Sequence, residues 1–278
     1  MRGIGGHGRE LRGQSQFALA YGSAARSSDW GRLAYDCVAQ LGELAGSAQL
    51  DFIYVTDALA GDLAAIVAFL KRTTSIADWV GSIGIGIVGG AHEYFDEPAM
   101  ALLAVRLPPG GHCLISGASA DPDAWRDAAA WAGRVSPVLG IVHADPRMPD
   151  LPGAIEVLAR DTATFLVGGL ASSRGWIAVG GEIAVGDPML FVRRDREAAE
   201  RDLVRMLAAL RRRMTGPPRA GLYFSCIARG RNLFGPNSAE LSIIRRELGD
   251  VPLAGLFCNG EISCDRLYSY TGVLALFV

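Results

Sequence analysis

Polar side chains that could bind a small molecule gather in the last quarter of the sequence. They follow two apolar stretches, residues 222–224 and 253–257, and one of them stands near the start of the helix expected between these stretches. The residues are Cys226, Arg229, Arg231, Glu240, Asn259, Gly260 and Glu261. Because the carboxyl ends of neighbouring strands in an α/β sheet meet at one crevice, we expect these groups to lie close together.

The combination of arginine and glutamate in this group suits a ligand that carries both charges. An arginine can bind a carboxylate through two hydrogen bonds, and a glutamate can bind an ammonium group. The sequence therefore predicts a pocket lined by Cys226, Arg229, Asn259 and Glu261, which would take an amino acid or a related small carboxylate. An internal Arg–Glu ion pair beside a tight Asn-Gly turn explains the same residues equally well at this point.

Patterns that would indicate a cofactor or catalysis are incomplete. The glycine spacing in residues 3–8 and 84–89 matches the dinucleotide-binding motif GxGxxG. That motif binds a pyrophosphate only between a strand and a helix, and neither segment lies between such elements. The four histidines are far apart, and only His143, at the end of an apolar stretch, is a candidate for a cavity ligand. We expect no catalytic residue and no metal site, and the alternative is an unrecognised enzyme that uses Cys226 or Glu261.

The elements that would position these residues recur three times along the chain. Each block reads as a strand, a helix, a glycine-bearing strand and a closing strand. The blocks are residues 51–107, 138–192 and 222–278, which are of similar length. A small residue followed by glycine marks the third element of each block, at Gly81, Gly168 and Gly255. We expect these glycines at equivalent positions on central strands.

This order of elements predicts an α/β fold with mixed β-sheets, built from repeated β-α-β-β units and flanked by helices. Hydrophobic periodicity adds three further helices, over residues 29–45, 121–131 and 196–214. We expect a frayed tail over residues 1–15, a first α/β domain over residues 16–185 and a second, shorter α/β domain over residues 186–278.

Composition excludes several classes of protein. The chain has 278 residues, of which 50% are hydrophobic and 20% charged, and this composition rules out an intrinsically disordered protein. A net charge of -2 gives no overall positive potential that would attract nucleic acid or an anionic membrane surface. Glycine or charged residues interrupt the apolar stretches before they reach the ~20 residues of a membrane-spanning helix. Five scattered cysteines indicate free thiols in the cytoplasm.

The sequence also resembles the FIST domain, a sensory-domain family of bacterial signalling proteins and an F-box protein. The most specific likeness, in order and spacing, lies in residues 225–235 (SCIARGRNLFG), Glu240, residues 252–263 (PLAGLFCNGEIS) and residues 271–274 (TGVL). Residues 79–108 and 167–171 are similar to the N-terminal half of the family. The stretch between Trp176 and Asp187 is shorter than the family pattern, so the sequence is identified as a compact member.

The resemblance implies a cytoplasmic sensory module for signal transduction that binds a small molecule, of the amino-acid or small-carboxylate class. Such a module would signal through a separate protein, for example a kinase or another output domain, without contacting nucleic acid or membrane. The resemblance also implies an alternative, a haem-binding gas sensor, in which His143 would be the candidate ligand and otherwise no cofactor is expected.

Overall fold

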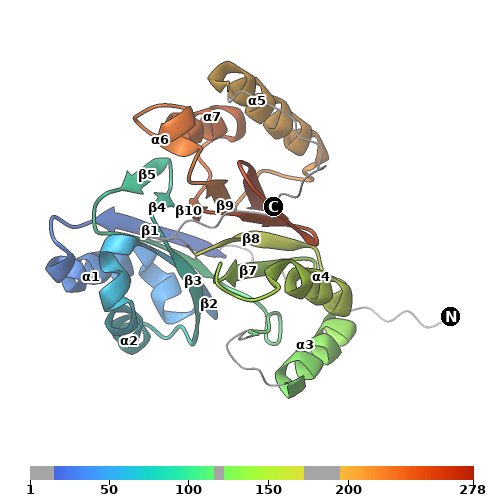
Figure 1. Cartoon of the computed structure of the whole chain (residues 1–278). Coiled ribbons are helices and arrows are strands. Elements are labelled where there is room, and N and C mark those ends of the chain that lie inside the picture. Colours follow the sequence, from blue (N-terminus) through green and yellow to red (C-terminus); the bar gives the residue numbers. More distant parts are fainter. Residues whose placement is uncertain (1–15, 116–121, 172–194) are drawn as a thin grey trace.

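The computed structural model of the chain describes residues 16–115, 122–171 and 195–278 (Figure 1). Three β-sheets form its interior, and helices pack against them. The predicted α/β fold with mixed sheets is therefore confirmed. No helix within the described ranges is both long and apolar enough to cross a membrane.

Each sheet combines one parallel pair of strands with antiparallel neighbours. The first sheet has the order β1 (Phe17–Ser23), β6 (Ala99–Val105), β2 (Leu50–Thr56) and β3 (Asp78–Gly84). The second has the order β13 (Gly272–Phe277), β9 (Ala220–Cys226), β10 (Leu253–Cys258), β4 (Gly86–Gly89) and β5 (His92–Phe95). The third has the order β12 (Arg266–Tyr268), β11 (Glu261–Ser263), β8 (Leu166–Leu170) and β7 (Gly140–Ala144). The parallel pairs are β2–β3, β9–β10 and β7–β8.

Three pairs of helices accompany the three sheets. They are α1 (Trp30–Leu41) with α2 (Leu63–Thr73), α3 (Pro122–Val135) with α4 (Leu151–Thr162), and α5 (Arg196–Arg213) with α7 (Ala239–Leu248). The short helix α6 (Gly230–Leu233) precedes α7, and 3-10 turns cover Ser27–Asp29, Gly42–Gly46 and Asp57–Asp62. In every pair the second helix connects the two parallel strands of one sheet. Each repeat therefore begins with a helix (α1, α3 or α5) that precedes the first strand of the block predicted from the sequence.

The three marked glycines occupy equivalent positions, as predicted. Each lies in the second strand of a parallel pair, opposite Ile53, Val142 or Tyr223 of the first strand. A Cβ atom at Gly81, Gly168 or Gly255 would lie 1.7, 1.9 or 1.8 Å from the backbone oxygen of that opposite residue. Only glycine permits so close an approach of two backbones. The strands β8 and β10 are internal, but β3 is at the edge of the described part of the first sheet, which corrects the expected central position of Gly81.

Two segments predicted as single glycine-bearing strands are each divided between two sheets. After β3 in the first sheet, β4 and β5 form a hairpin that joins the second sheet beside β10. After β10 in the second sheet, β11 and β12 form a hairpin that joins the third sheet beside β8. The crossing at Gly84 is tight, since a Cβ there would lie 2.4 Å from the backbone oxygen of Gly86. The first repeat thus completes the second sheet, and the third repeat completes the third sheet.

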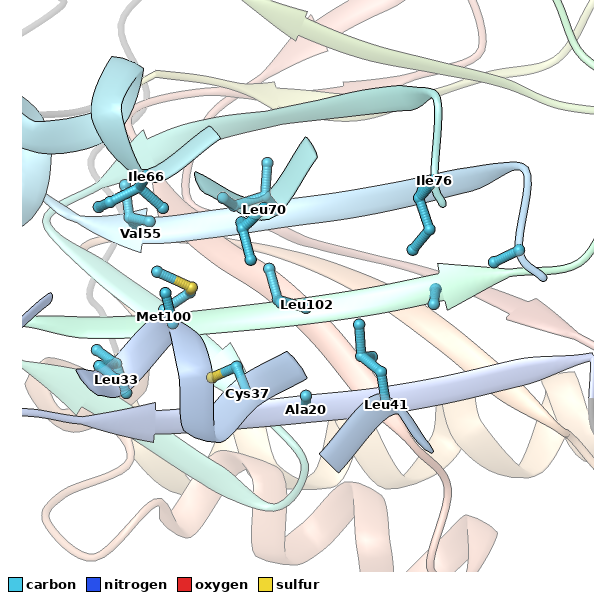
Figure 2. Close-up of a cluster of buried hydrophobic side chains, with 14 of the residues drawn as sticks. Ala20, Leu33, Cys37, Leu41, Val55, Ile66, Leu70, Ile76, Met100 and Leu102 are labelled. Carbon is cyan, nitrogen blue, oxygen red and sulfur yellow. The ribbon is translucent and has the colours of Figure 1, made fainter. Parts of the chain in front are cut away.

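The predicted domain boundary near Val185 lies outside the described residues and stays a prediction. Strands on both sides of it share the second and third sheets, because β4 and β5 pair beside β10, and β8 pairs with β11. The hydrophobic core of the described residues is divided into four clusters of side chains. One of them packs α1 and α2 against the first sheet (Figure 2). Similar clusters lie beneath α5 and α7 and beneath α4, and a fourth fills the space between the sheets.

Three aromatic rings from equivalent positions meet in the cluster between the sheets. Tyr54, His143 and Phe224 each follow directly the residue that faces a marked glycine. Their ring centroids are 5.5 Å apart for Tyr54 and His143, 6.2 Å for Tyr54 and Phe224, and 5.9 Å for His143 and Phe224. One ring from each sheet thus joins a single contact group, which is the arrangement of an approximate threefold repeat.

Candidate functional site

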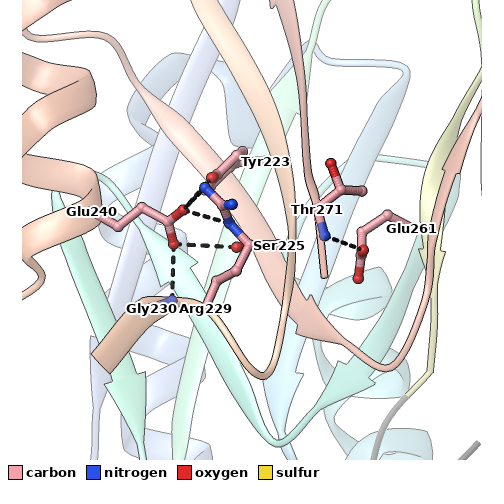
Figure 3. Close-up of polar contacts among 7 residues, drawn as sticks. All are labelled: Tyr223, Ser225, Arg229, Gly230, Glu240, Glu261 and Thr271. Atoms are coloured by element: carbon pink, nitrogen blue, oxygen red, sulfur yellow. Dashed lines mark hydrogen bonds and ion pairs between the residues drawn. The ribbon is translucent and has the colours of Figure 1, made fainter. Parts of the chain in front are cut away.

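The Glu240 carboxylate is the centre of a buried polar cluster on the side of the second sheet that faces α7. Glu240 lies in the first turn of α7 and is fully buried. Its Oε1 accepts hydrogen bonds from the Tyr223 hydroxyl at 2.8 Å and from Arg229 Nε and Nη2 at 2.9 and 2.6 Å (Figure 3). Its Oε2 accepts from the Ser225 hydroxyl at 3.2 Å and from the backbone N–H of Gly230 at 3.0 Å. We call these five residues the Glu240 cluster.

Within the described residues, the hydrogen bonds of the Glu240 carboxylate are all made inside the Glu240 cluster. Burial, with the Glu240 carboxylate beside it, raises the pKa of Tyr223 well above its ordinary value, so the phenol remains a proton donor. The Arg229 side chain is 13% exposed and its charge is matched by Glu240. Charge-assisted hydrogen bonds are among the stronger protein contacts, and here they saturate the carboxylate. The structure therefore realises the internal Arg–Glu ion pair that the sequence left open.

A second polar group surrounds Glu261, and the charge of Arg229 from the Glu240 cluster acts on its carboxyl group. The backbone N–H of Thr271 donates to Glu261 Oε2 at 3.0 Å (Figure 3). The Cys258 thiol lies 3.5 Å from Glu261 Oε1. The Cys226 thiol also bonds this carboxylate, and burial raises the pKa of Glu261 to about 7. Cys258 belongs to the cluster between the sheets, whereas Tyr223 faces α7. Glu261 and Cys226 thus lie with Cys258, and Glu240 lies with Tyr223 on the side that faces α7, while the charge of Arg229 acts on both carboxylates.

The remaining predicted residues lie at the edge of these groups. Arg231 forms an ion pair with Asp96 at 2.5 Å, and its guanidinium lies 4.4 Å from the centroid of the Phe95 ring. Asn259 and Gly260 form the link between β10 and β11, where the Gly260 oxygen accepts from the Leu170 N–H at 2.9 Å. A single pocket lined by Cys226, Arg229, Asn259 and Glu261 stays a prediction.

Glu93 is a buried acid that the prediction of site residues missed. It lies on β5, is 8% exposed, and neither of its carboxylate oxygens has a hydrogen-bond partner within the described residues. A Cβ at Gly230 would lie 3.3 Å from Glu93 Oε2, so the carboxyl group touches the loop of the Glu240 cluster. Burial, and next the charge of Glu240, raise the pKa of Glu93 to about 8 against the opposing effects of Arg231 and of the backbone N–H of Leu241.

Comparison of the repeats shows how unusual these polar groups are. Tyr223 and Ser225 face α7 from positions that the first sheet fills with Ile53 and Val55. The counterpart of Glu93 in the third sheet is Leu267. In the second sheet Gly255 pairs with Val88, and Val88 pairs with Glu93. In the third sheet the equivalent Gly168 pairs with Ile262, and Ile262 pairs with Leu267. The third sheet therefore packs with an apolar side chain at the position that Glu93 occupies in the second sheet. At these positions the second sheet thus carries polar side chains where the compared repeats have apolar ones, and we take this as a sign of function.

A signal for Glu93 was present in the sequence. It is a charged residue between His92 and the aromatic pair Tyr94 and Phe95, in a segment with strand character. Its relation to Glu240 could not be predicted, because it depends on the hairpin β4–β5 joining a sheet formed by residues more than a hundred positions later.

The side chains around His143 do not fit a haem ligated by this residue. Its Nε2 is 3.0 Å from the Tyr54 hydroxyl, and its ring contacts Tyr54 and Phe224 in the cluster between the sheets. The ring nitrogen that most often binds iron is thus engaged, and aromatic rings occupy the space beside it. No group of three or more metal-binding side chains is found in the described ranges.

His143 should instead make the protein sensitive to acid. Burial lowers its pKa to about 4. The unfolded chain takes up this proton near pH 6.5, so stability should fall by about 1.4 kcal/mol per pH unit between about pH 6.5 and pH 4 because of this residue alone. Urea unfolding of the wild type and of His143→Gln over this range measures the difference. The exposed His92→Gln is the control, and parallel curves for wild type and His143→Gln would contradict the assignment.

The fold and the cluster together define a three-repeat α/β protein with a buried polar cluster beneath α7. Family comparison then gives its identity. The FIST N domain matches residues 49–187 and the FIST C domain matches residues 139–264, so the chain belongs to the FIST family. The two matches share residues 139–187, which include β7, α4 and β8.

The curated relatives are mycobacterial. An uncharacterized protein of Mycobacterium tuberculosis is 38% identical over 121 residues, which cover 41% of this chain and 32% of the relative. An uncharacterized protein of Mycobacterium bovis is 36% identical over 121 residues, which cover 41% of this chain and 31% of the relative. The match thus spans about a third of the length of these relatives.

Proposed function

We propose that this FIST protein is a sensory module that binds a small zwitterion, of the amino-acid class, at Glu93 and the neighbouring Arg231. The observation that carries the proposal is the Glu93 carboxyl group, which is buried without a hydrogen-bond partner where the third sheet has Leu267. A buried carboxyl group is costly unless it is paired. A ligand ammonium group would supply the missing partner.

Arg231 is better placed than Arg229 to bind the ligand carboxylate. Arg229 already makes two hydrogen bonds to Glu240 and is largely buried. The Arg231 side chain is 43% exposed, acts electrostatically on Glu93, and is held by Asp96, whose side chain is 48% exposed. An exposed ion pair contributes about 0–1 kcal/mol, so a ligand carboxylate can replace Asp96 at low cost.

A structural role for Glu93 competes with this proposal. The backbone N–H of Glu93 donates to the Ser238 hydroxyl at 2.8 Å, and its carboxyl group is near the backbone N–H of Leu241 in the first turn of α7. Glu93 could therefore serve to hold the start of α7. The two roles differ in what they predict for ligand binding per folded molecule and for its dependence on pH.

Calorimetric titration with 4-aminobutyrate, butyrate and butylamine, beside a panel of amino acids, tests the proposal. An ammonium group requires ionised Glu93, whose pKa is about 8 with Glu240 and Arg231 facing it. Affinity for the zwitterions should therefore rise about tenfold per pH unit from about pH 6 to pH 8, with release of a proton. Glu93→Gln should abolish this dependence and weaken binding at pH 8 at least tenfold.

Glu156→Gln, an exposed glutamate on α4, is the matched control and should bind like the wild type. If Glu93→Gln lowers the melting temperature but leaves binding per folded molecule unchanged, Glu93 is structural. Failure of the whole panel to bind at pH 8 would refute the proposal. We further propose binding without turnover, in the cytoplasm, with the signal passed to a separate protein.

A further inference from the structure

A groove of about 670 Å³ lies between α5 and α7, on the outside of the helix pair that covers the second sheet. Its charged residues include Arg196 and Arg201 from α5 and Arg246 from α7. Val204 and Ile243 contribute apolar surface. The groove thus offers positive charge on both helices beside the apolar side chains of Val204, Pro236 and Ala239, and an amphipathic helix with acidic residues around its apolar side would match both features.

We propose that this groove docks an acidic, amphipathic helical segment of a partner protein, and the inference rests on the proposed sensory function. Charge complementarity selects the partner. Three arginines and a single acid, Glu200, are the charged side chains that line the groove. The side chains of Arg196, Arg201 and Arg246 are 55%, 71% and 62% exposed, so their present ion pairs are surface pairs that a partner can replace.

A smaller hollow, of about 230 Å³, lies between α3 and α4. It is lined mostly by small residues, with Asp161 as its charged side chain, and it lies at the C-terminal ends of these helices, whereas the α5–α7 groove begins at the N-terminal ends of its helices. The docking proposal therefore depends on the residues of the α5–α7 groove itself.

One helix connects the groove to the proposed ligand site. The inner side of α7 carries Glu240, and Ser238 just before it accepts the hydrogen bond from Glu93. Ala239, Ser242, Ile243 and Arg246 of the same helix line the groove. A ligand that pairs with Glu93 acts next to the first turn of α7, so the ligand and the partner contact opposite sides of one element.

Fluorescence anisotropy with a labelled peptide tests the docking surface. The probe is a helical peptide of about 14 residues with leucines at i, i+4 and i+7 and glutamates around them. We expect binding at about 50 mM salt that weakens several-fold at about 300 mM, because the contacts are ionic. The triple variant Arg196→Glu, Arg201→Glu and Arg246→Glu should weaken binding at least tenfold. A peptide with lysine in place of glutamate should not bind.

The matched control replaces three exposed arginines of α5 outside the groove, Arg205→Glu, Arg212→Glu and Arg213→Glu, with the same change of charge. Equal loss in the two triple variants would overturn the proposal, as would a labelled single-stranded oligonucleotide that binds as tightly as the peptide. No binding of the acidic peptide at low salt would also overturn it. Titration of each variant with 4-aminobutyrate separates this outcome from failure of the ligand site.

Discussion

Replacement of Arg229 by alanine should destabilise the folded protein by about 3–5 kcal/mol, because it leaves the Glu240 carboxylate buried without its countercharge. Glu240 is fully buried, and two of its hydrogen bonds come from this guanidinium. The remaining donors, Tyr223, Ser225 and the Gly230 N–H, are neutral. Urea unfolding at pH 7 measures the loss, and the exposed Arg205→Ala should change stability by no more than about 0.5 kcal/mol.

The double variant Arg229→Ala, Glu240→Gln separates the ion pair from packing. Removal of both charges should recover a large part of the loss, since neither group is then buried without a partner. A ligand-binding role for Arg229 predicts the opposite pattern, namely little effect on stability and at least tenfold weaker binding of 4-aminobutyrate. A stable Arg229→Ala protein with weakened binding would restore the direct ligand contact that the sequence suggests.

Alanine at any of the three equivalent glycines should prevent stable folding or cost about 3 kcal/mol or more. The new Cβ at Gly81, Gly168 or Gly255 would lie 1.7–1.9 Å from a backbone oxygen of the neighbouring parallel strand. Overpacking usually costs about 1–3 kcal/mol when side chains can adjust, but here the obstacle is the backbone of a sheet. Soluble yield and urea unfolding of Gly81→Ala, Gly168→Ala and Gly255→Ala measure the effect.

The control is Gly133→Ala in α3, where a Cβ meets nothing within 4 Å. Alanine favours the helix over glycine by up to about 1 kcal/mol, so this variant should be slightly more stable than the wild type. Similar losses at the three strand positions would support the equivalence of the repeats. A tolerated alanine at one position would mean that the strands separate there and that the repeat is not equivalent at that place.

Much of the fold follows from local features of the sequence. Alternation and glycine spacing predicted the α/β class, the recurrence of the unit and the equivalence of Gly81, Gly168 and Gly255, because strand and helix formation depend on neighbouring residues. The family resemblance was also readable in short motifs of the C-terminal part. The association of Arg229 with Glu240 was within reach, since the loop and helix that carry them are adjacent in the sequence.

Only the tertiary structure decided which strands complete which sheet. Exchange of the hairpins between sheets brings Glu93 beside Gly230, and alternation of side chains across β9 and β10 places Cys258 and Tyr223 on opposite faces. The physical reason is that local propensity determines whether a strand forms, whereas its partner depends on burial of apolar surface across the whole molecule. The candidate site could therefore be predicted as residue types but not as an arrangement.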